Sequence, residues 1–323
     1  MTTTPLRRRG SAAAAVLLGA ALVLSACGSE DDGADKTGET HSIKVDNGTI
    51  EVPVDPQRVV TIGGTAQPFV DLGGKPVGVT PYYQPEALPD DQKATFDAAT
   101  DIGNEEIDIE KVASLEPDLI LVQSDDAGFE KIQKQLEAIA PTVFWGLDTE
   151  WKTMAGAIAE AGNVTEGLTE QKAEFEERVS GIQEKYRELI DSTSFVNVAR
   201  WDNADPGTFS VADIGCVEVA TDDVGMNFAK AAEGEDPLGW ASLPFEQIAD
   251  LAKYDVITYD VDAEGQPKEP FEPVVETNTW KALPAVKSGR ALGVFCPGNG
   301  SYGQVNRYLE SLDAALATLP AEE

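Results

Sequence analysis

Short apolar runs alternate along this chain with segments whose apolar residues recur every three or four positions. In the first half, the runs expected to form strands span residues 58–62, 76–80, 119–122 and 141–145. The segments that have the helical period span residues 66–72, 109–115, 128–138 and 151–161. Strands that alternate with helices in this way predict a mostly parallel sheet with helices on both faces.

The same alternation restarts after a single long helix predicted over Leu168–Ile190, which is apolar on one face and polar on the other. Beyond it, strands are predicted at 195–199, 255–259 and 291–295, and a last helix at 306–319. The pattern therefore predicts an α/β fold of two lobes with mostly parallel sheets. One long rigid helix joins the lobes, and a ligand cleft is expected between them.

One helix–strand unit occurs twice, once in each predicted lobe. Residues Glu110–Leu115 and Glu246–Leu251 read almost alike, and each is followed by an apolar strand. The apolar positions of each helix share one face, which leaves Glu110 and Glu246 pointing outward. A carboxylate in the first turn complements the helix dipole, which is sufficient reason for either glutamate alone. Their matching register indicates in addition a docking surface with one acidic side chain per lobe, for a partner with two-fold symmetry.

The first 26 residues have the composition of a signal peptide. Three arginines precede the apolar stretch Ala12–Leu24, and Ser25-Ala26 leads directly to Cys27. This looks like a bacterial lipobox, in which Cys27 is acylated and becomes the mature N-terminus; an ordinary signal peptide with an incidental cysteine is the alternative. The expected order is a signal peptide (1–26), a disordered acidic tether (27–42), an N-terminal lobe (43–161), a connecting helix (162–192) and a C-terminal lobe (193–323).

The chain is strongly acidic, with 57 Asp and Glu against 24 Lys and Arg and a formal net charge of −33. Such a surface repels nucleic acid, and we expect no nucleic-acid partner. The single histidine, His41, lies in the predicted tether, which argues against a zinc or manganese ion held directly by side chains. Apart from Cys27, the chain contains Cys216 and Cys296. An even pair in an exported protein favours a disulfide over two free thiols.

Taken together, these features resemble the periplasmic-binding-protein family that serves ABC importers of iron-siderophores, haem and cobalamin. The resemblance covers Ile43–Leu319. It is carried by Asp101–Val122, by the second copy at Leu243–Tyr259, by the lipobox and by the long helix. In this family one glutamate per lobe engages arginines of the two permease subunits, a role that the resemblance gives to Glu110 and Glu246. It also implies that the lobes move only slightly when ligand binds.

The resemblance implies a ferric siderophore as ligand, held by side chains at the carboxyl ends of strands. Aromatic walls, with an arginine or tyrosine that hydrogen-bonds the iron-ligating oxygens, suit such a bulky complex. Arg200-Trp201 is the strongest pair because it directly follows strand 195–199. A triscatecholate complex would need several arginines, so a neutral or cationic ferric hydroxamate is favoured, with haem and cobalamin left open. The candidate ligand-binding residues are Gln67, Tyr82, Tyr83, Trp145, Arg200, Trp201, Trp240 and Tyr302.

The predicted function is that of a monomeric lipoprotein on the outer face of the bacterial cytoplasmic membrane. It captures a ferric siderophore without a cofactor and delivers it to an ABC permease dimer. An exported enzyme with paired carboxylates is the competing class, and a sensor module on the same fold is a third. Against the enzyme, the chain has no G-x-S-x-G motif and no histidine placed to activate a nucleophile. Gly298–Gly303 matches G-x-G-x-x-G, but Pro297 separates it from its strand, and a loop near the cleft is expected there instead of a dinucleotide site.

Overall fold

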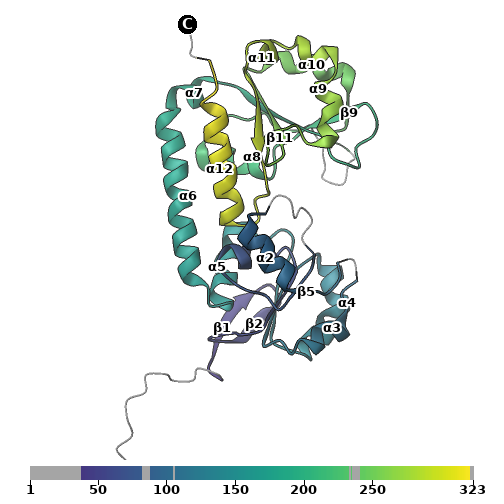
Figure 1. Cartoon of the computed structure of the whole chain (residues 1–323), viewed down its shortest axis with the longest axis vertical. Coiled ribbons are helices and arrows are strands. Elements are labelled where there is room, and N and C mark those ends of the chain that lie inside the picture. The colour runs from purple at the N-terminus through teal and green to yellow at the C-terminus, as the bar shows by residue number, and fades with distance from the viewer. Residues whose placement is uncertain (1–37, 82–87, 105, 233, 235–240, 321–323) are drawn as a thin grey trace, which may run out of the picture. The chain divides into compact units, whose positions relative to one another are not determined.

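The structure is a computed structural model that describes residues 38–81, 88–104, 106–232, 234 and 241–320. All of these belong to one compact unit, Lys36–Glu323. Their strands form two five-stranded sheets and one two-stranded hairpin, and the two larger sheets lie in separate lobes (Figure 1). Within the described ranges, no helix combines the length and the apolar character needed to cross a membrane.

The sheet of the N-terminal lobe is wholly parallel and has the order β5-β4-β3-β6-β7. Its strands are β3 (Val59–Gly63), β4 (Gly78–Val79), β5 (Thr100–Asp101), β6 (Leu119–Gln123) and β7 (Thr142–Trp145). The helices that follow them are α1 (Ala66–Asp71), α2 (Asp90–Ala98), α3 (Ile109–Ser114), α4 (Asp126–Glu137) and α5 (Trp151–Ala161). The strand order reverses between β3 and β6, which makes this pair the topological switch point of the sheet.

The sheet of the C-terminal lobe has the order β10-β9-β8-β11-β12 and reverses between β8 and β11. Strands β8 (Phe195–Ala199), β11 (Val256–Val261) and β12 (Ala291–Phe295) are parallel; β9 (Thr208–Val211) and β10 (Leu243–Pro244) are antiparallel additions. The remaining elements are α8 (Cys216–Glu218), η2 (Val219–Val224), η3 (Phe245–Lys253), η4 (Glu269–Phe271), α9 (Glu272–Val275), α10 (Asn278–Ala282), α11 (Pro284–Lys287) and α12 (Tyr302–Leu316). The predicted α/β fold of two lobes with mostly parallel sheets is confirmed.

The connection between the lobes differs from the single helix predicted over Leu168–Ile190. Helix α6 spans Thr165–Lys185, and after Tyr186, which has φ −116°, the short helix α7 (Arg187–Ser192) follows. The hydroxyl of Tyr186 donates to the backbone oxygen of Asp313 in α12 at 3.0 Å. The break was invisible in the sequence because the apolar spacing continues through it.

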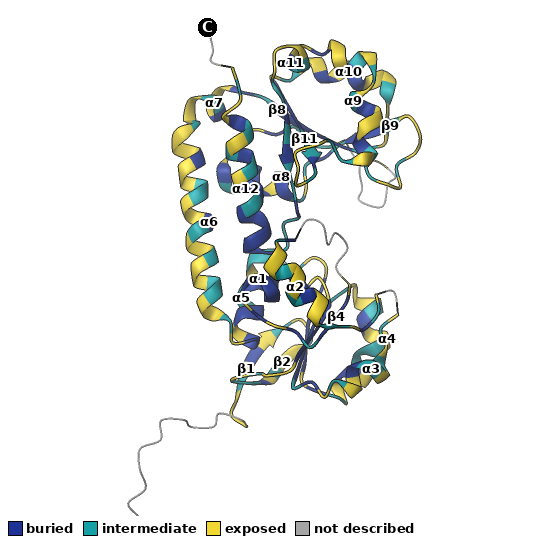
Figure 2. Ribbon diagram, in the orientation of Figure 1, coloured by how far each residue is buried: buried dark blue, intermediate teal, exposed yellow. Residues whose placement is uncertain are grey.

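Helices α6 and α12 pack side by side (Figure 1). Lys185 pairs with Asp313 at 2.7 Å, and Arg178 pairs with Glu310 at 3.4 Å. Figure 2 shows α12 largely buried, whereas α6 is exposed along its outer side. Because α6 leads from one lobe to the other and α12 runs beside it, the lobes are joined by a packed helical pair.

A hairpin of β1 (Thr40–Val45) and β2 (Gly48–Pro53) precedes the first sheet. The turn residue Asn47 donates its side-chain amide to the backbone oxygen of Thr142 at 2.9 Å and accepts from the backbone N–H of Phe144 at 3.1 Å. The predicted tether, 27–42, therefore ends too late, since strand structure begins at Thr40. The polar alternation of β1, with Ile43 as its one buried residue, gave little signal in the sequence.

The two copies of the repeated unit form different helices. In the first copy, the side chain of Asp108 accepts a hydrogen bond from the backbone N–H of Lys111 at 2.9 Å and caps α3. In the second, Pro244 precedes the helix and has no side-chain acceptor, and residues 245–253 form the 3-10 helix η3. The helix predicted at Glu246–Leu251 is present as a 3-10 helix, and Ile248 and Leu251 are buried as the pattern required.

Candidate functional site

The carboxyl ends of both sheets lie on the side where the lobes meet. Strand β3 ends at Gly63 and leads within three residues to α1, whereas β12 ends at Phe295 and leads through a short loop to α12. The side chain of Ser301, the N-cap of α12, donates a hydrogen bond to Asp71 at the end of α1. Because these two helices touch, the ligand-binding edges of the two sheets are turned toward each other.

The N-terminal lobe carries a cavity of about 990 Å³ at its switch point. Gly63 and Gln123 are register partners there, and a Cβ on Gly63 would lie 2.0 Å from the backbone oxygen of Gln123. Gly63 also has φ +65°, which only glycine adopts without strain. Its N–H donates to Thr80 Oγ1 at 3.1 Å, so the floor of the cavity is fixed by backbone geometry. The volume falls in the range of cavities that hold small-molecule ligands.

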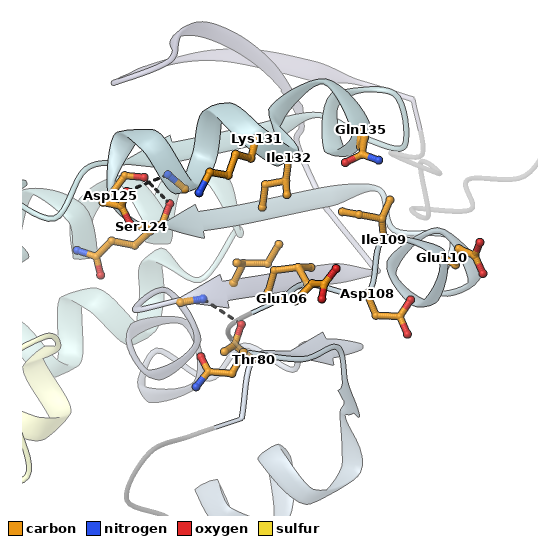
Figure 3. A pocket seen from close by; sticks show the side chains of 16 residues that line it. Thr80, Glu106, Asp108, Ile109, Glu110, Ser124, Asp125, Lys131, Ile132 and Gln135 are labelled. Atoms are coloured by element: carbon orange, nitrogen blue, oxygen red, sulfur yellow. Dashed lines mark hydrogen bonds between the residues drawn. The ribbon is translucent and has the colours of Figure 1, made fainter.

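The rim of this cavity is mainly acidic. The carboxylates of Glu106, Asp108 and Asp125 border it together with the ammonium group of Lys131, and Glu110 also lies beside it on α3. Two of the three carboxylates have structural roles, because Asp108 caps α3 and Asp125 accepts from the backbone N–H of Gly128 at 2.8 Å to cap α4. Figure 3 shows Lys131 and Ser124 over the floor, and Glu110 pointing outward from the far side of α3.

The C-terminal lobe carries a smaller recess of about 190 Å³ at its own switch point, between β8 and β11. Asn197 and Thr258 are register partners at its base, and Thr258 Oγ1 donates to Asn197 Oδ1 at 2.9 Å. Its walls include Ala199, Trp201, Ala212, Ile214, Asp260 and Tyr308. Each lobe thus offers one cavity at the position where parallel sheets hold their ligands.

A disulfide closes one side of this recess. Cys216 and Cys296 both border it and are joined, with Cα atoms 6.0 Å apart. The bond ties the first residue of α8 to the residue that follows β12, 80 residues further along the chain. The disulfide favoured by the cysteine count is confirmed.

Of the predicted ligand-binding residues that the structure describes, Trp201 is the one that lines a cavity at a switch point. Trp145 is 2 % exposed and packs in the core of the N-terminal lobe, because α5 and the hairpin cover the strand end on which it lies. Tyr302 is 4 % exposed, and its ring lies 4.8 Å from that of Trp151 and 5.6 Å from that of Phe175. The prediction that these two residues face the ligand is not supported by their positions.

Arg200 and Gln67 both have their donors engaged within the protein. The guanidinium of Arg200 donates to the backbone oxygens of Thr208 at 3.0 Å and Pro270 at 2.7 Å, which fixes the loop after β8. Gln67 is buried in α1 and donates to Asp71 and Gln92 at 2.8 and 2.9 Å. Cys27, Tyr82, Tyr83 and Trp240 lie outside the described residues.

The junction between the lobes is built around Asp71, whose side chain is fully buried. It accepts hydrogen bonds from Gln67, Gln92 and Ser301, and Arg307 Nη1 lies 3.9 Å away. Burial raises the pKa of the Asp71 carboxyl above its ordinary value, although these donors and Arg307 act in the opposite direction. A Cβ on Gly303 would lie 2.5 Å from this carboxylate, so glycine is required for α12 to approach α1.

Glu110 and Glu246 are both exposed in the first turn of their helices. Neither takes part in a hydrogen bond or an ion pair with another described residue. Their outward placement agrees with the apolar pattern of the two repeats.

Sequence reasoning missed the polar residues of the two cavities. Asp260 lies near the end of β11 and Gln123 at the end of β6, positions that the strand-end rule marks. Aromatic and arginine side chains were predicted at such positions instead. Among the described residues, no group of three or more His, Cys, Asp and Glu is arranged to hold a metal ion.

Several known proteins resemble this chain in sequence. A family model described as periplasmic binding protein matches residues 59–292. The probable siderophore-binding lipoprotein YfiY of Bacillus subtilis is 29 % identical over 291 residues, which cover 85 % of this chain and 87 % of the relative. The iron(3+)-hydroxamate-binding protein FhuD of the same organism is 28 % identical over 310 residues, covering 88 % and 89 % of the two chains.

Solved structures resemble this chain in fold as well. The siderophore periplasmic binding protein from the fuscachelin gene cluster of Thermobifida fusca superposes with a TM-score of 0.72 at 27 % identity. The match covers 83 % of this chain and 99 % of that one.

Proposed function

Because the chain belongs to the periplasmic binding protein family, whose members bind solutes and are not enzymes, we propose that it captures a ferric siderophore and delivers it to an ABC importer. A ferric hydroxamate is the favoured ligand class. The observation that carries the proposal is the pair of cavities at the two switch points, on sheet edges turned toward each other. Relatives named for siderophore and hydroxamate binding support it.

The acidic rim of the N-terminal cavity supports the choice of ligand charge. Its carboxylates would repel a triscatecholate complex with three negative charges. Arg200, the arginine best placed by sequence to balance such charge, donates to backbone oxygens instead. A neutral or cationic complex would not be repelled by these carboxylates and would not need an arginine to balance its charge.

A fluorescence titration tests the ligand class. The chain from Gly28 onward is titrated with ferric hydroxamates, ferric catecholates, haem, cobalamin and iron-free siderophores. Trp201 borders the recess, and an iron complex bound beside it quenches its emission. Saturable quenching at submicromolar concentrations by ferric hydroxamates alone is the expected result. Quenching by haem or cobalamin alone would mean that this compound, and not a siderophore, is the ligand.

Docking to the permease is proposed to involve Glu110 and Glu246. Both are exposed and without a partner among the described residues, as a carboxylate that meets an arginine of another protein should be. In cells, the double change Glu110→Ala with Glu246→Ala should abolish uptake of the iron complex, while the purified variant keeps its affinity for it. The control changes one exposed glutamate per lobe elsewhere, Glu130→Ala with Glu272→Ala. Uptake that survives the first pair, or is lost equally in the second, would exclude this docking role.

The chain is further proposed to be a lipoprotein held at the membrane through Cys27, with the acidic residues before the hairpin as a tether. The lipobox and the names of the relatives support this location. Metabolic labelling with a fatty acid should mark the wild-type chain. A Cys27→Ser variant should remain unlabelled and be found in the soluble fraction.

A further inference from the structure

The carboxylate in the recess of the C-terminal lobe lacks a hydrogen-bond donor. Asp260 borders the recess near the end of β11, and no hydrogen bond to its side chain is found among the described residues. The nearest cation is the ammonium group of Lys268, with Nζ 3.9 Å from Asp260 Oδ2. That distance is beyond hydrogen-bond reach, so Lys268 contributes charge without satisfying the carboxylate oxygens.

The other polar groups around the recess do not supply this donor. Thr258 Oγ1 already donates to Asn197. The hydroxyl of Tyr308 has no hydrogen-bond partner among the described residues. Neither group therefore supplies a hydrogen bond to Asp260, which borders the recess.

The environment also disfavours an unpaired negative charge. Burial raises the pKa of the Asp260 carboxyl, while Lys268 lowers it. Burial likewise raises the pKa of the Tyr308 phenol, and the charge on Asp260 adds to that effect. A half-buried carboxylate without a donor gains more from an incoming cation than an exposed one does, because less water competes for it.

The remaining wall is aromatic and apolar. Trp201 packs beside Ala199 and Ala212 and borders the recess on the side of β8. An aromatic ring next to a carboxylate is a suitable surface for an ammonium or guanidinium group, which stacks on the ring while it bonds the acid. The volume of about 190 Å³ is too small for a whole ferric complex but sufficient for one side arm of it.

We propose that this recess binds a basic group, a primary ammonium or a guanidinium, carried on an arm of the ferric complex. Asp260 is the acceptor and Trp201 the aromatic wall. The inference rests on the proposed function and narrows it, since the preferred ligand is then a siderophore with a cationic substituent. The acidic rim of the cavity on the opposite lobe favours the same ligand charge.

Two linear ferric trihydroxamates that differ at one terminus test the proposal. One ends in a primary amine, and in the other this amine is acetylated. They are titrated into the chain from Gly28 onward, which contains the whole compact unit Lys36–Glu323. The wild type should bind the amine form roughly tenfold more tightly than the acetylated form, as a charge-assisted hydrogen bond requires.

Asp260→Asn should reduce the affinity for the amine form to that for the acetylated form and leave the acetylated form unaffected. Asp250→Asn is the control, because it removes the same charge from an exposed site in η3 of the same lobe. This variant should keep the tenfold preference. Thermal unfolding of both variants verifies that they are folded.

The outcomes separate this inference from the function on which it rests. Equal affinity of the wild type for both complexes, or a preference that persists in Asp260→Asn, overturns the cationic recess and leaves hydroxamate binding intact. A neutral arm in the recess would give that result. Binding of neither complex overturns the hydroxamate assignment and this inference together.

Discussion

Asp71 and Asp260 are both withdrawn from water, one at the junction between the lobes and the other in the recess of the C-terminal lobe. Burial raises the pKa of both carboxyls. Their partners differ: three side chains from both lobes donate to the carboxylate of Asp71, whereas no donor within the described ranges bonds to the carboxylate of Asp260.

The difference separates a structural carboxylate from one available to a ligand. A buried polar group whose hydrogen bonds are satisfied fixes the elements that satisfy it, here α1, α2 and α12. A carboxylate left without donors at a strand end, beside a cavity, is instead positioned for a group from outside the chain. Both sites hold an aspartate, but Asp71 is fully buried and Asp260 is 32 % exposed, and hydrogen-bond donors are supplied to the carboxylate of Asp71 alone.

The junction and the recess are also stabilised by different interactions. Removing the disulfide beside the recess should reduce stability more than any other change. Side-chain hydrogen bonds fix the junction, whereas the Cys216–Cys296 bond fixes the loops around the recess. For a loop of this length, chain entropy predicts a loss of about 4 kcal/mol in the free energy of unfolding for Cys216→Ser with Cys296→Ser. Urea unfolding with and without a reductant measures it. The reductant should destabilise the wild type alone, and an equal response of the double variant would contradict the assignment.

Replacing each of the two aspartates with asparagine should affect stability less than removing the disulfide does. The replacement should destabilise the protein at Asp71 and leave its stability almost unchanged at Asp260. Asp71→Asn brings amide donors against the donors of Gln67 and Gln92, and should lower the free energy of unfolding by about 2 kcal/mol. Asp260→Asn breaks no hydrogen bond and should change it by less than about 0.5 kcal/mol. Denaturant midpoints of the two variants provide the comparison. Comparable losses in both would show that Asp260 is as structural as Asp71.

The smallest expected effect is the change of stability with pH. Its direction follows from the raised pKa of Asp71. Because burial raises this pKa above 3.8, the folded protein binds the proton more tightly than the unfolded chain. The contribution of Asp71 to stability is therefore greatest at low pH and declines as pH rises from about 4 through the raised value. The difference in unfolding free energy between wild type and Asp71→Asn should shrink over that range. A difference that grows with pH would mean that the donors outweigh burial.

The fold could be predicted from the sequence because strand and helix patterns are local. The alternation of apolar runs identified the parallel strands of both lobes except the two-residue β5, and the repeated EKVASL and EQIADL segments placed one exposed glutamate on each lobe. The break at Tyr186 and the hairpin at Thr40–Pro53 were missed. The apolar spacing runs through the first, and the second has few buried residues.

The candidate site could be predicted only in part, because it depends on partners distant in sequence. Trp201 was found from its place after a strand. Whether Arg200 faced a ligand depended on the backbone oxygen of Pro270, 70 residues away, and the partners of Asp71 include Ser301, 230 residues away. Trp145 is the last residue of its strand, close to a position that the strand-end rule marks, but the hairpin and α5 cover it. Contacts of this kind leave no periodic signal.

The contact of Asn47 with β7 also bears on solubility. Strand β7 is the last strand of its sheet, and such a strand can pair with another copy of the chain through its free backbone groups. The Asn47 side chain occupies two of these groups, at Thr142 and Phe144. At the corresponding end of the other sheet, Ser311 accepts from the backbone N–H of Phe295 in β12. Chains crowded on one surface are thereby hindered from joining sheet to sheet and aggregating.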